Sequence, residues 1–254
     1  MCIEDGDGRD LELKVPITTS TCELPERTVS VSYDAIVFDL DGVLLTGYHT
    51  APTVYREAAR ETLADFDVTI EAVPDGLVNP DDTGEVRAFC AHHDLPPEAF
   101  WGYREHASTV LENDRIIAGE REPFDDVDVL PSLAEETTLG IVSNNRHGTV
   151  RFVREYFDWG DAFGAVRGRA PTLDGYDRMK PDPHYLGHTI DALEVEPTET
   201  LFVGDRLSDV ETADRAGTDS ALLVRDDDRP TGDPDPTHVI DSLRDLEPLA
   251  SDGY

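Results

Sequence analysis

The sequence has little lysine, few basic residues of any kind and no long apolar run. Lys14 and Lys180 are its two lysines, and 21 basic residues stand against 55 acidic ones, for a formal net charge of −34. Such a surface repels nucleic acid and anionic lipid, so we expect neither nucleic acid nor a membrane as a partner. No apolar run approaches the ~20 residues that a membrane-spanning helix needs.

Cysteine is also scarce. Cys2, Cys22 and Cys90 are scattered, without the spacing of a zinc site or the even number of a disulfide framework. Residues 1–32 are polar and acidic, and they lack the basic start and the apolar stretch of a secretory signal. We therefore expect a cytoplasmic protein, as a monomer or a homodimer.

The acid excess is spread along the whole chain instead of being collected in one tail. At molar salt the Debye length falls to ~3 Å, and the repulsion between such charges is screened. The composition therefore predicts a halophilic protein, which we expect to come from a haloarchaeal source. The alternative is an ordinary acidic protein. With 39% hydrophobic residues, the chain has enough apolar side chains for a buried core.

Short apolar runs alternate with helical patterns in most of the chain. The apolar runs, which predict buried strands, are 35–38, 139–142, 201–203 and 221–224, and 165–166 is a shorter candidate. Helical spacing is found over 130–137, 147–157, 183–193 and 208–216. Strands that alternate with helices predict an α/β fold with a parallel sheet and right-handed crossovers.

One stretch departs from this alternation. Helical spacing recurs without an intervening strand over 53–66, 84–95 and 97–118. We therefore predict a helical domain at 47–124, inserted into a core domain formed by 33–46 and 125–254. Residues 1–32 are interpreted as an N-terminal extension that is poorly ordered.

Polar side chains follow three of the apolar runs, and a lysine precedes a predicted helix. These residues are Asp39, Asp41, Ser143, Asn144, Lys180, Asp205 and Asp209. The carboxyl ends of parallel strands share one edge of a sheet, so we expect these groups to line one crevice. Crowded carboxylates need a cation, and all-oxygen ligands suit Mg²⁺.

A metal ion at this edge, held by Asp39 and Asp205 with Asp209 nearby, could bridge to a phosphate group. Lys180 would add a positive charge near the same phosphate, and Ser143 could donate a hydrogen bond to one of its oxygens. One carboxylate could then attack phosphorus, and Asp41 is placed to protonate the leaving oxygen and later to activate water.

Four motifs occur in the order and at the spacing of the haloacid dehalogenase-like (HAD) hydrolases. The chain resembles this family through Phe38-Asp39-Leu40-Asp41-Gly42-Val43-Leu44, Ser143-Asn144, Lys180-Pro181-Asp182-Pro183 and Gly204-Asp205-Arg206-Leu207-Ser208-Asp209. The resemblance covers roughly residues 34–225, and in layout it is similar to the phosphoglycolate-phosphatase-like members. Those relatives often carry Asp-Ser soon after the first motif, where this chain has Thr46-Gly47.

The resemblance implies a Rossmann-like core with a helical cap at 47–124. It implies Asp39 as the nucleophile and Asp41 as the acid/base. The substrate phosphate would be bound by Ser143, Asn144 and Lys180. Magnesium would be held by Asp39, the Asp41 backbone carbonyl and Asp205, with Asp209 as the outer acid of the metal site.

We therefore predict a Mg²⁺-dependent phosphatase that hydrolyses a small phosphorylated metabolite through an aspartyl-phosphate. The haloacid dehalogenases themselves lack the second aspartate of the first motif, so Asp41 favours phosphoryl transfer over dehalogenation. The alternatives are a phosphomutase similar to β-phosphoglucomutase, and a non-catalytic phosphate- or partner-binding protein that kept the fold. Phosphoglycolate, sugar phosphates and nucleotides all remain open as substrates.

Overall fold

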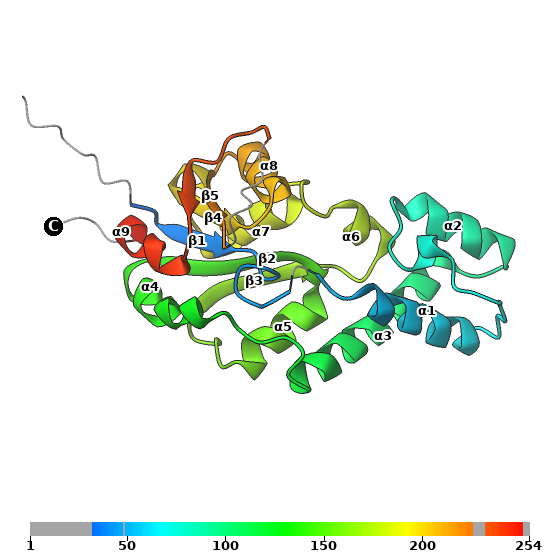
Figure 1. Ribbon diagram of the computed structural model, residues 1–254. Coiled ribbons are helices and arrows are strands. Elements are labelled where there is room, and N and C mark those ends of the chain that lie inside the picture. Colours follow the sequence, from blue (N-terminus) through cyan, green and yellow to red (C-terminus); the bar gives the residue numbers. More distant parts are fainter. Residues whose placement is uncertain (1–31, 48, 226–231, 251–254) are drawn as a thin grey trace, which may run out of the picture.

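Four consecutive apolar residues form β1 (Ala35–Phe38), the central strand of the computed structural model, which describes residues 32–47, 49–225 and 232–250 (Figure 1). β1 pairs in parallel with β2 (Thr138–Arg146) on one side and with β4 (Thr200–Gly204) on the other. Its four side chains are fully buried, as expected of a parallel strand that is covered on both faces.

The sheet of the described residues is parallel throughout. Its six strands lie in the order β3-β2-β1-β4-β5-β6, and every neighbouring pair is parallel. The remaining strands are β3 (Phe163–Arg169), β5 (Asp219–Leu223) and β6 (His238–Ile240). The predicted α/β fold with a parallel sheet is confirmed.

Alternate side chains of β1 enter two apolar clusters, one on each face of the sheet. Ile36 and Phe38 belong to one cluster and Val37 to the other. The first cluster includes residues of α4 (Leu130–Glu136) and α5 (His147–Tyr156), and the second includes residues of α7 (His184–Leu193) and α8 (Leu207–Ala216). The core therefore has three layers, with helices on both faces of the sheet.

The segment 47–124, which lies between β1 and β2, forms helices as its named elements. They are α1 (Pro52–Asp65), the 3-10 helix η1 (Asp75–Leu77), α2 (Thr83–His92) and α3 (Pro97–Ile117). Figure 1 shows α1 and α2 at the end of the molecule opposite α9 (Glu247–Ala250). These helices have an apolar cluster of their own around Phe100 and Trp101, and α6 (Leu173–Asp177) adds Leu173 and Tyr176 to it.

Some elements differ from those expected from the sequence pattern. β2 extends to Arg146, past the apolar run at 139–142, because it keeps pairing with β3 as far as Arg169 through a shift in register. Short elements were not predicted, because three to five residues are too few to show a period. They are α6, β6, α9, η1, η2 (Asp125–Val129), η3 (Pro197–Glu199) and η4 (Leu243–Leu246).

The predicted N-terminal extension at 1–32 lies, apart from Ser32, outside the described residues. Among the helices that the structure describes, none combines the length and the apolar character needed to cross a membrane.

Leu201 on β4 is fully buried in the larger cluster of the core. We expect Leu201→Ala to lower the free energy of unfolding by about 2–5 kcal/mol, because it removes apolar contacts and leaves a cavity. Val239→Ala is the control, since Val239 is 41% exposed on β6, and it should change the same quantity by less than about 0.5 kcal/mol. Urea denaturation in molar KCl measures both, and equal effects would contradict the assignment of Leu201 to the core.

Candidate active site

Three aspartates meet at the carboxyl edge of the sheet. Asp39 follows β1, Asp205 follows β4, and Asp209 lies in the first turn of α8. One carboxylate oxygen from each lies within 4.8 Å of the other two. The shared edge predicted from the topology is therefore present, and we call these three residues the acid cluster.

Lys180 supplies a positive charge inside this cluster. Its Nζ atom lies 2.9 Å from Asp39 Oδ1 and 2.6 Å from Asp209 Oδ1, and its side chain is 3% exposed. Burial alone would lower the pKa of Lys180, but the two carboxylates raise it by more, so the ammonium stays charged. The lysine that the sequence places next to a helix is thus the cation of the site.

One ammonium does not neutralise three carboxylates in a buried site. Burial raises the pKa of Asp39 to about 7, with Lys180 acting against it and Asp209 adding to it. Burial also raises the pKa of Asp205 to about 6, and the nearby Asp209 contributes. The acid cluster therefore favours a second cation.

The donor set fits Mg²⁺. Asp205 Oδ1 is buried and has no hydrogen-bond partner among the described residues, so its lone pairs are available to a ligand. Carboxylate oxygens from Asp39, Asp205 and Asp209 are the hard donors that Mg²⁺ prefers. Asp41 was also predicted at the metal site, but its side-chain oxygens do not belong to this group of three. Only the backbone carbonyl that the resemblance implies remains as its contribution.

Asp209 has two roles at once, and Gly204 makes room for it. Its Oδ2 atom accepts the backbone N–H of Arg206 at 3.1 Å and so caps α8, while Oδ1 faces Lys180. A Cβ atom on residue 204 would lie 2.2 Å from the Cβ of Asp209. Glycine at the end of β4 therefore permits the close approach that brings Asp209 to the acid cluster.

The Asp41 side chain is held by three partners outside the acid cluster. Arg121 Nη2 donates to Asp41 Oδ1 at 2.7 Å, and Asn145 Nδ2 donates to Oδ2 at 3.1 Å. The Oγ atom of Ser143 lies 3.5 Å from Oδ2. Gly42, with φ of 87°, begins the turn that folds the chain back behind Asp41. Asp39 and Asp41 thus face different partners, although they are two residues apart.

The polar end of β2 carries Ser143 and Asn144. Ser143 is buried, and its Oγ accepts the backbone N–H of Asn145 at 3.1 Å. Asn144 Oδ1 accepts the N–H of Lys180 at 2.7 Å, and its Nδ2 donates to the carbonyl of Lys180 at 3.2 Å. Both polar atoms of the Asn144 side chain are therefore bonded to the Lys180 backbone, so this side chain positions Lys180. Its Nδ2 atom has a second N–H, and Asn144 lines the cavity, so the predicted phosphate contact stays a prediction.

Arg121 was not predicted. It is 8% exposed, and besides Asp41 it binds Glu112 Oε1 on α3 at 2.8 Å. It also donates to the carbonyls of Thr46 and Gly47, at 2.8 and 2.9 Å. No motif surrounds Arg121, so the one available signal was its place at the boundary between the predicted helical insert and the core. Asn145, which follows the second motif directly, was not among the predicted site residues either.

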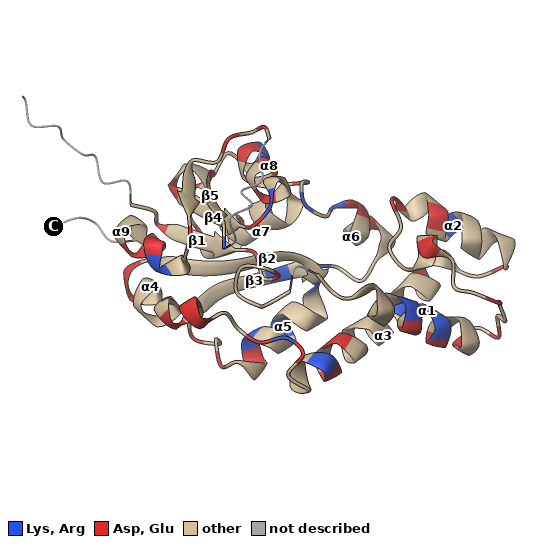
Figure 2. Ribbon diagram, viewed as in Figure 1, with Lys and Arg blue, Asp and Glu red and all other residues tan. Residues whose placement is uncertain are grey.

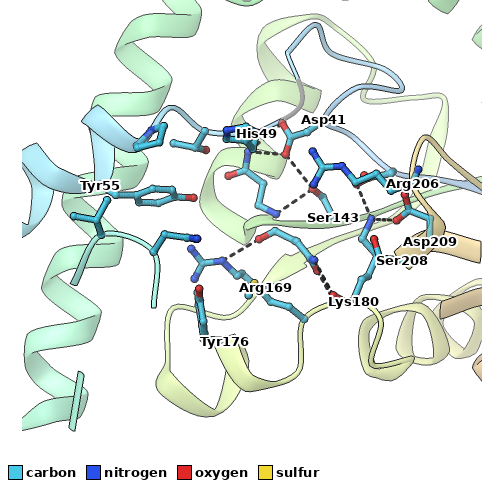
Figure 3. Close-up of a pocket in the computed structure, with 18 of the residues that line it drawn as sticks. Asp41, His49, Tyr55, Ser143, Arg169, Tyr176, Lys180, Arg206, Ser208 and Asp209 are labelled. Atoms are coloured by element: carbon cyan, nitrogen blue, oxygen red, sulfur yellow. Dashed lines mark hydrogen bonds and ion pairs between the residues drawn. The ribbon is translucent and has the colours of Figure 1, made fainter. Parts of the chain in front are cut away.

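A cavity of about 390 Å³ joins these groups. Asp39, Asp41, Ser143 and Lys180 line it from the core. Figure 3 shows Tyr55, Arg169 and Tyr176 at one end of the pocket and Lys180 and Asp209 at the other. Asp39 and Asp209 of the acid cluster thus line a cavity large enough for a small metabolite.

These features define a class of protein: an α/β enzyme with an aspartate pair, a lysine and a cluster of three acids at the carboxyl edge of its sheet. The family model of the haloacid dehalogenase-like hydrolases matches residues 33–217. The chain therefore belongs to this family, as its motifs predicted.

Relatives with phosphatase names match the chain to different extents. It is 31% identical to the N-acetylmuramic acid 6-phosphate phosphatase of Pseudomonas putida over 195 residues, which cover 74% of this chain and 82% of that protein. It is 42% identical to phosphoglycolate phosphatase 1 of Pseudomonas aeruginosa over 79 residues, which cover 30% of this chain and 29% of that protein. The expectation of an enzyme of the phosphoric monoester hydrolase type is confirmed.

A solved structure supports the fold. The crystal structure of CbbY from Rhodobacter sphaeroides in complex with phosphate superposes with a TM-score of 0.60 and 20% identity. The match covers 85% of this chain and 99% of that one. At this identity the comparison establishes the shared fold.

Removal of Arg121 tests its role in holding Asp41. We expect Arg121→Gln to lower kcat about 10–100-fold on the ester that the enzyme hydrolyses best. The reason is that displacing a catalytic carboxylate by about 1 Å lowers the rate by about that factor. Arg121→Lys should restore part of the rate, since it keeps the charge beside Asp41. Arg244→Gln, which removes an exposed arginine paired with Asp128, is the matched control. A folded Arg121→Gln variant with full kcat would contradict the role.

The raised pKa values predict how the metal-free protein responds to pH. In the unfolded chain Asp39 titrates near 3.8, and in the folded protein near 7. The folded state binds more protons in this window, so its stability falls as pH rises from about 4 to about 7. Asp39→Asn should make the free energy of unfolding depend less on pH between about 4 and 7. Asp128→Asn, a control at an exposed position, should leave this dependence unchanged. Urea unfolding with a chelator present measures the slopes, and identical slopes for all three proteins would refute the assignment.

Proposed function

We propose that this protein is a Mg²⁺-dependent phosphatase that hydrolyses a small phosphorylated metabolite through an aspartyl-phosphate on Asp39. The observation that carries the proposal is the place of Asp39. Its carboxylate lies at the cavity, 2.9 Å from Lys180 Nζ and beside Asp205 and Asp209. A nucleophilic carboxylate, a fixed cation and ligands for a divalent ion thus lie together.

In the first step a carboxylate oxygen of Asp39 attacks phosphorus, and the bond to the ester oxygen breaks. The leaving oxygen takes a proton from Asp41, so the products are an alcohol and the aspartyl-phosphate. In the second step water attacks phosphorus and gives a proton to Asp41. Inorganic phosphate leaves, and both aspartates return to their starting states.

Other residues hold the reacting groups in place. Lys180 would contact the phosphoryl oxygens and offset their charge, and Ser143 Oγ would donate a hydrogen bond to one of them. Arg121 and Asn145 keep Asp41 in one orientation. Mg²⁺ bound to Asp39, Asp205 and Asp209 would neutralise the acid cluster and polarise the phosphoryl group.

The helical segment at 47–124 is proposed as a cap that closes over the substrate. Seven of its residues, Tyr55 and Arg104 among them, line the same cavity as Asp39. A closed cap would keep bulk water away during the first step. Opening of the cap would admit water for the second step. The chain passes between cap and core at residues 46–47 and near 121, and Arg121 binds the backbone at the first of these crossings.

We further propose that the enzyme works in molar salt, in the cytoplasm of a halophile. Figure 2 shows Asp and Glu on helices throughout the molecule, on α2 as well as on α4 and α9. The formal net charge of −34 produces strong self-repulsion at low ionic strength. Salt that shortens the Debye length removes most of this repulsion.

Phosphate release from a panel of small phosphate esters tests the function, in molar KCl with and without Mg²⁺. We expect Mg²⁺-dependent release by the native protein and a loss of at least about 1,000-fold in Asp39→Asn, because the nucleophile is gone. Asp174→Asn, an exposed aspartate on α6, is the matched control and should retain the activity.

The outcomes separate the proposal from its alternatives. Circular dichroism in the same salt confirms that each variant is folded. Folded protein that releases no phosphate from any ester would overturn the phosphatase function. Transfer of the phosphoryl group between two positions of a sugar, without release, would indicate a phosphomutase.

A further inference from the structure

A second charged cluster lies away from the acid cluster, and two of its residues, Arg104 and Arg169, line the same cavity. Arg104 on α3, Arg146 at the end of β2 and Arg169 at the end of β3 are each only 1–2% exposed. Glu105 on α3 is fully buried among them and forms ion pairs with Arg104 and Arg169. We call these four residues the arginine cluster.

The positive charge of this cluster exceeds its negative charge. Among the described residues, Glu105 is the one carboxylate paired with these guanidinium groups, so three positive charges face a single negative one. Arg146 Nε and Nη1 are buried and have no hydrogen-bond partner in the described part of the chain. Burying an uncompensated charge costs free energy. Such a buried charge is tolerated where the charge of a ligand offsets it.

The aromatic ring of Tyr55 stabilises part of this positive charge through cation–π contacts. The Arg104 and Arg146 guanidinium carbons lie 4.3 and 5.1 Å from the centre of the Tyr55 ring. Burial would raise the pKa of Tyr55, but Arg146 and Arg169 lower it by more, so the net shift is downward. The cluster acts on its surroundings as a net cation, in a protein whose overall charge is strongly negative.

Holding the cap against the core would not require all four residues of the arginine cluster. Glu105 on α3 already joins the two parts through its ion pair with Arg169 on β3. Arg146 gives no hydrogen bond to Glu105, and its Nη2 donates to Thr50 at 3.2 Å. The excess of arginine therefore calls for an explanation beyond the contact between α3 and β3.

The position of the cluster points to the substrate. Arg104 and Arg169 line the cavity that holds Asp39 and Lys180. Figure 3 places Arg169, with Tyr55 and Tyr176, across the pocket from Lys180 and Asp209. The hydrogen bonds of Arg104 and Arg169 to the protein use some of their five N–H donors, which leaves donors for a ligand. One substrate could thus reach both charged ends.

We propose that the arginine cluster binds a second anionic group of the substrate. The substrate is then a small phosphate ester that also carries a carboxylate or a second phosphate, with its reacting phosphate at Asp39. This inference rests on the proposed phosphatase function. Guanidinium groups bind both kinds of anion through charge-assisted hydrogen bonds, so the chemistry they share is a negative charge with two or more acceptor oxygens.

Matched pairs of esters test the proposal and distinguish the two anions. The first pair is 2-phosphoglycolate and 2-hydroxyethyl phosphate, and the second is 1,3-propanediol bisphosphate and 3-hydroxypropyl phosphate. We expect kcat/KM to favour the ester with the additional anion by at least about 100-fold in one pair, because a site built for a polar group rejects the analogue that lacks it. Equal kcat/KM within both pairs would overturn the second-anion site and leave the phosphatase function intact.

A variant tests whether the arginine cluster causes the preference for the ester with the additional anion. Arg169→Gln should reduce the ratio of kcat/KM within the preferred pair at least about 10-fold, mainly through KM for the anionic ester. Arg56→Gln removes a positive charge from an exposed position on α1, next to Tyr55, and should leave the ratio unchanged. An equal change in both variants would indicate a long-range charge effect and contradict direct binding.

Binding to an inactive variant keeps the two proposals separate. Calorimetry on Asp39→Asn with Mg²⁺ measures the affinity for 2-phosphoglycolate, the bisphosphate and their two partners that lack the second anionic group, without turnover. Tighter binding of an anionic ester would support the cluster as an anion site even if the native protein hydrolysed none of them. Equal affinity for all four esters would refute the anion site, including in the case where Arg169→Gln fails to fold.

Discussion

The ammonium of Lys180, held between Asp39 and Asp209, is the interaction on which the rest of the site depends. Three carboxylates gather at one edge of the sheet because β1 and β4 are neighbours and α8 begins directly after β4. Without a cation their mutual repulsion in a buried position would force some of them to take up protons. Lys180 removes part of this cost, and the raised pKa values of Asp39 and Asp205 show that part of it remains.

The same constraint explains the neighbouring structure. Asn144 uses both polar atoms of its side chain to hold the backbone of Lys180, which fixes where the ammonium can reach. Gly204 lets Asp209 approach the end of β4 more closely than a side chain would allow. These residues need touch no substrate to matter, because they set the distance between the charges.

Charged side chains also connect the helical segment with the core. Arg121 joins Asp41 to Glu112 on α3, and Glu105 joins α3 to Arg169 on β3. Both connections are buried, where ion pairs are screened less than at the surface. A change in the position of α3 would therefore be felt at Asp41, the residue proposed to carry the proton. The position of the helical segment at 47–124 and the geometry of the site are thus linked by a few side chains.

Much of the fold and of the site could be predicted from the order of residues alone. Apolar runs of three or four residues predicted β1, β4 and β5. The polar residues after β1 and β4, and those that follow the apolar run of β2, predicted the shared crevice, because parallel strands end at a common edge. The single lysine of the core, Lys180, was recognised by its motif. By contrast, β6 and α6 are too short to show a period, and no local pattern distinguishes Arg121 from the other arginines of the chain.

The order of residues was enough to predict the parallel α/β core, the helices between β1 and β2 and the polar residues at the strand ends, since each depends on neighbours along the chain. The tertiary structure decided which side chains from distant segments meet. Arg121 reaches Asp41 across 80 positions, and Glu105 reaches Arg169 across 64. It also decided that Asn144 faces the backbone of Lys180. The physical reason is that burial and charge pairing depend on distances in space, which local propensity and spacing do not encode.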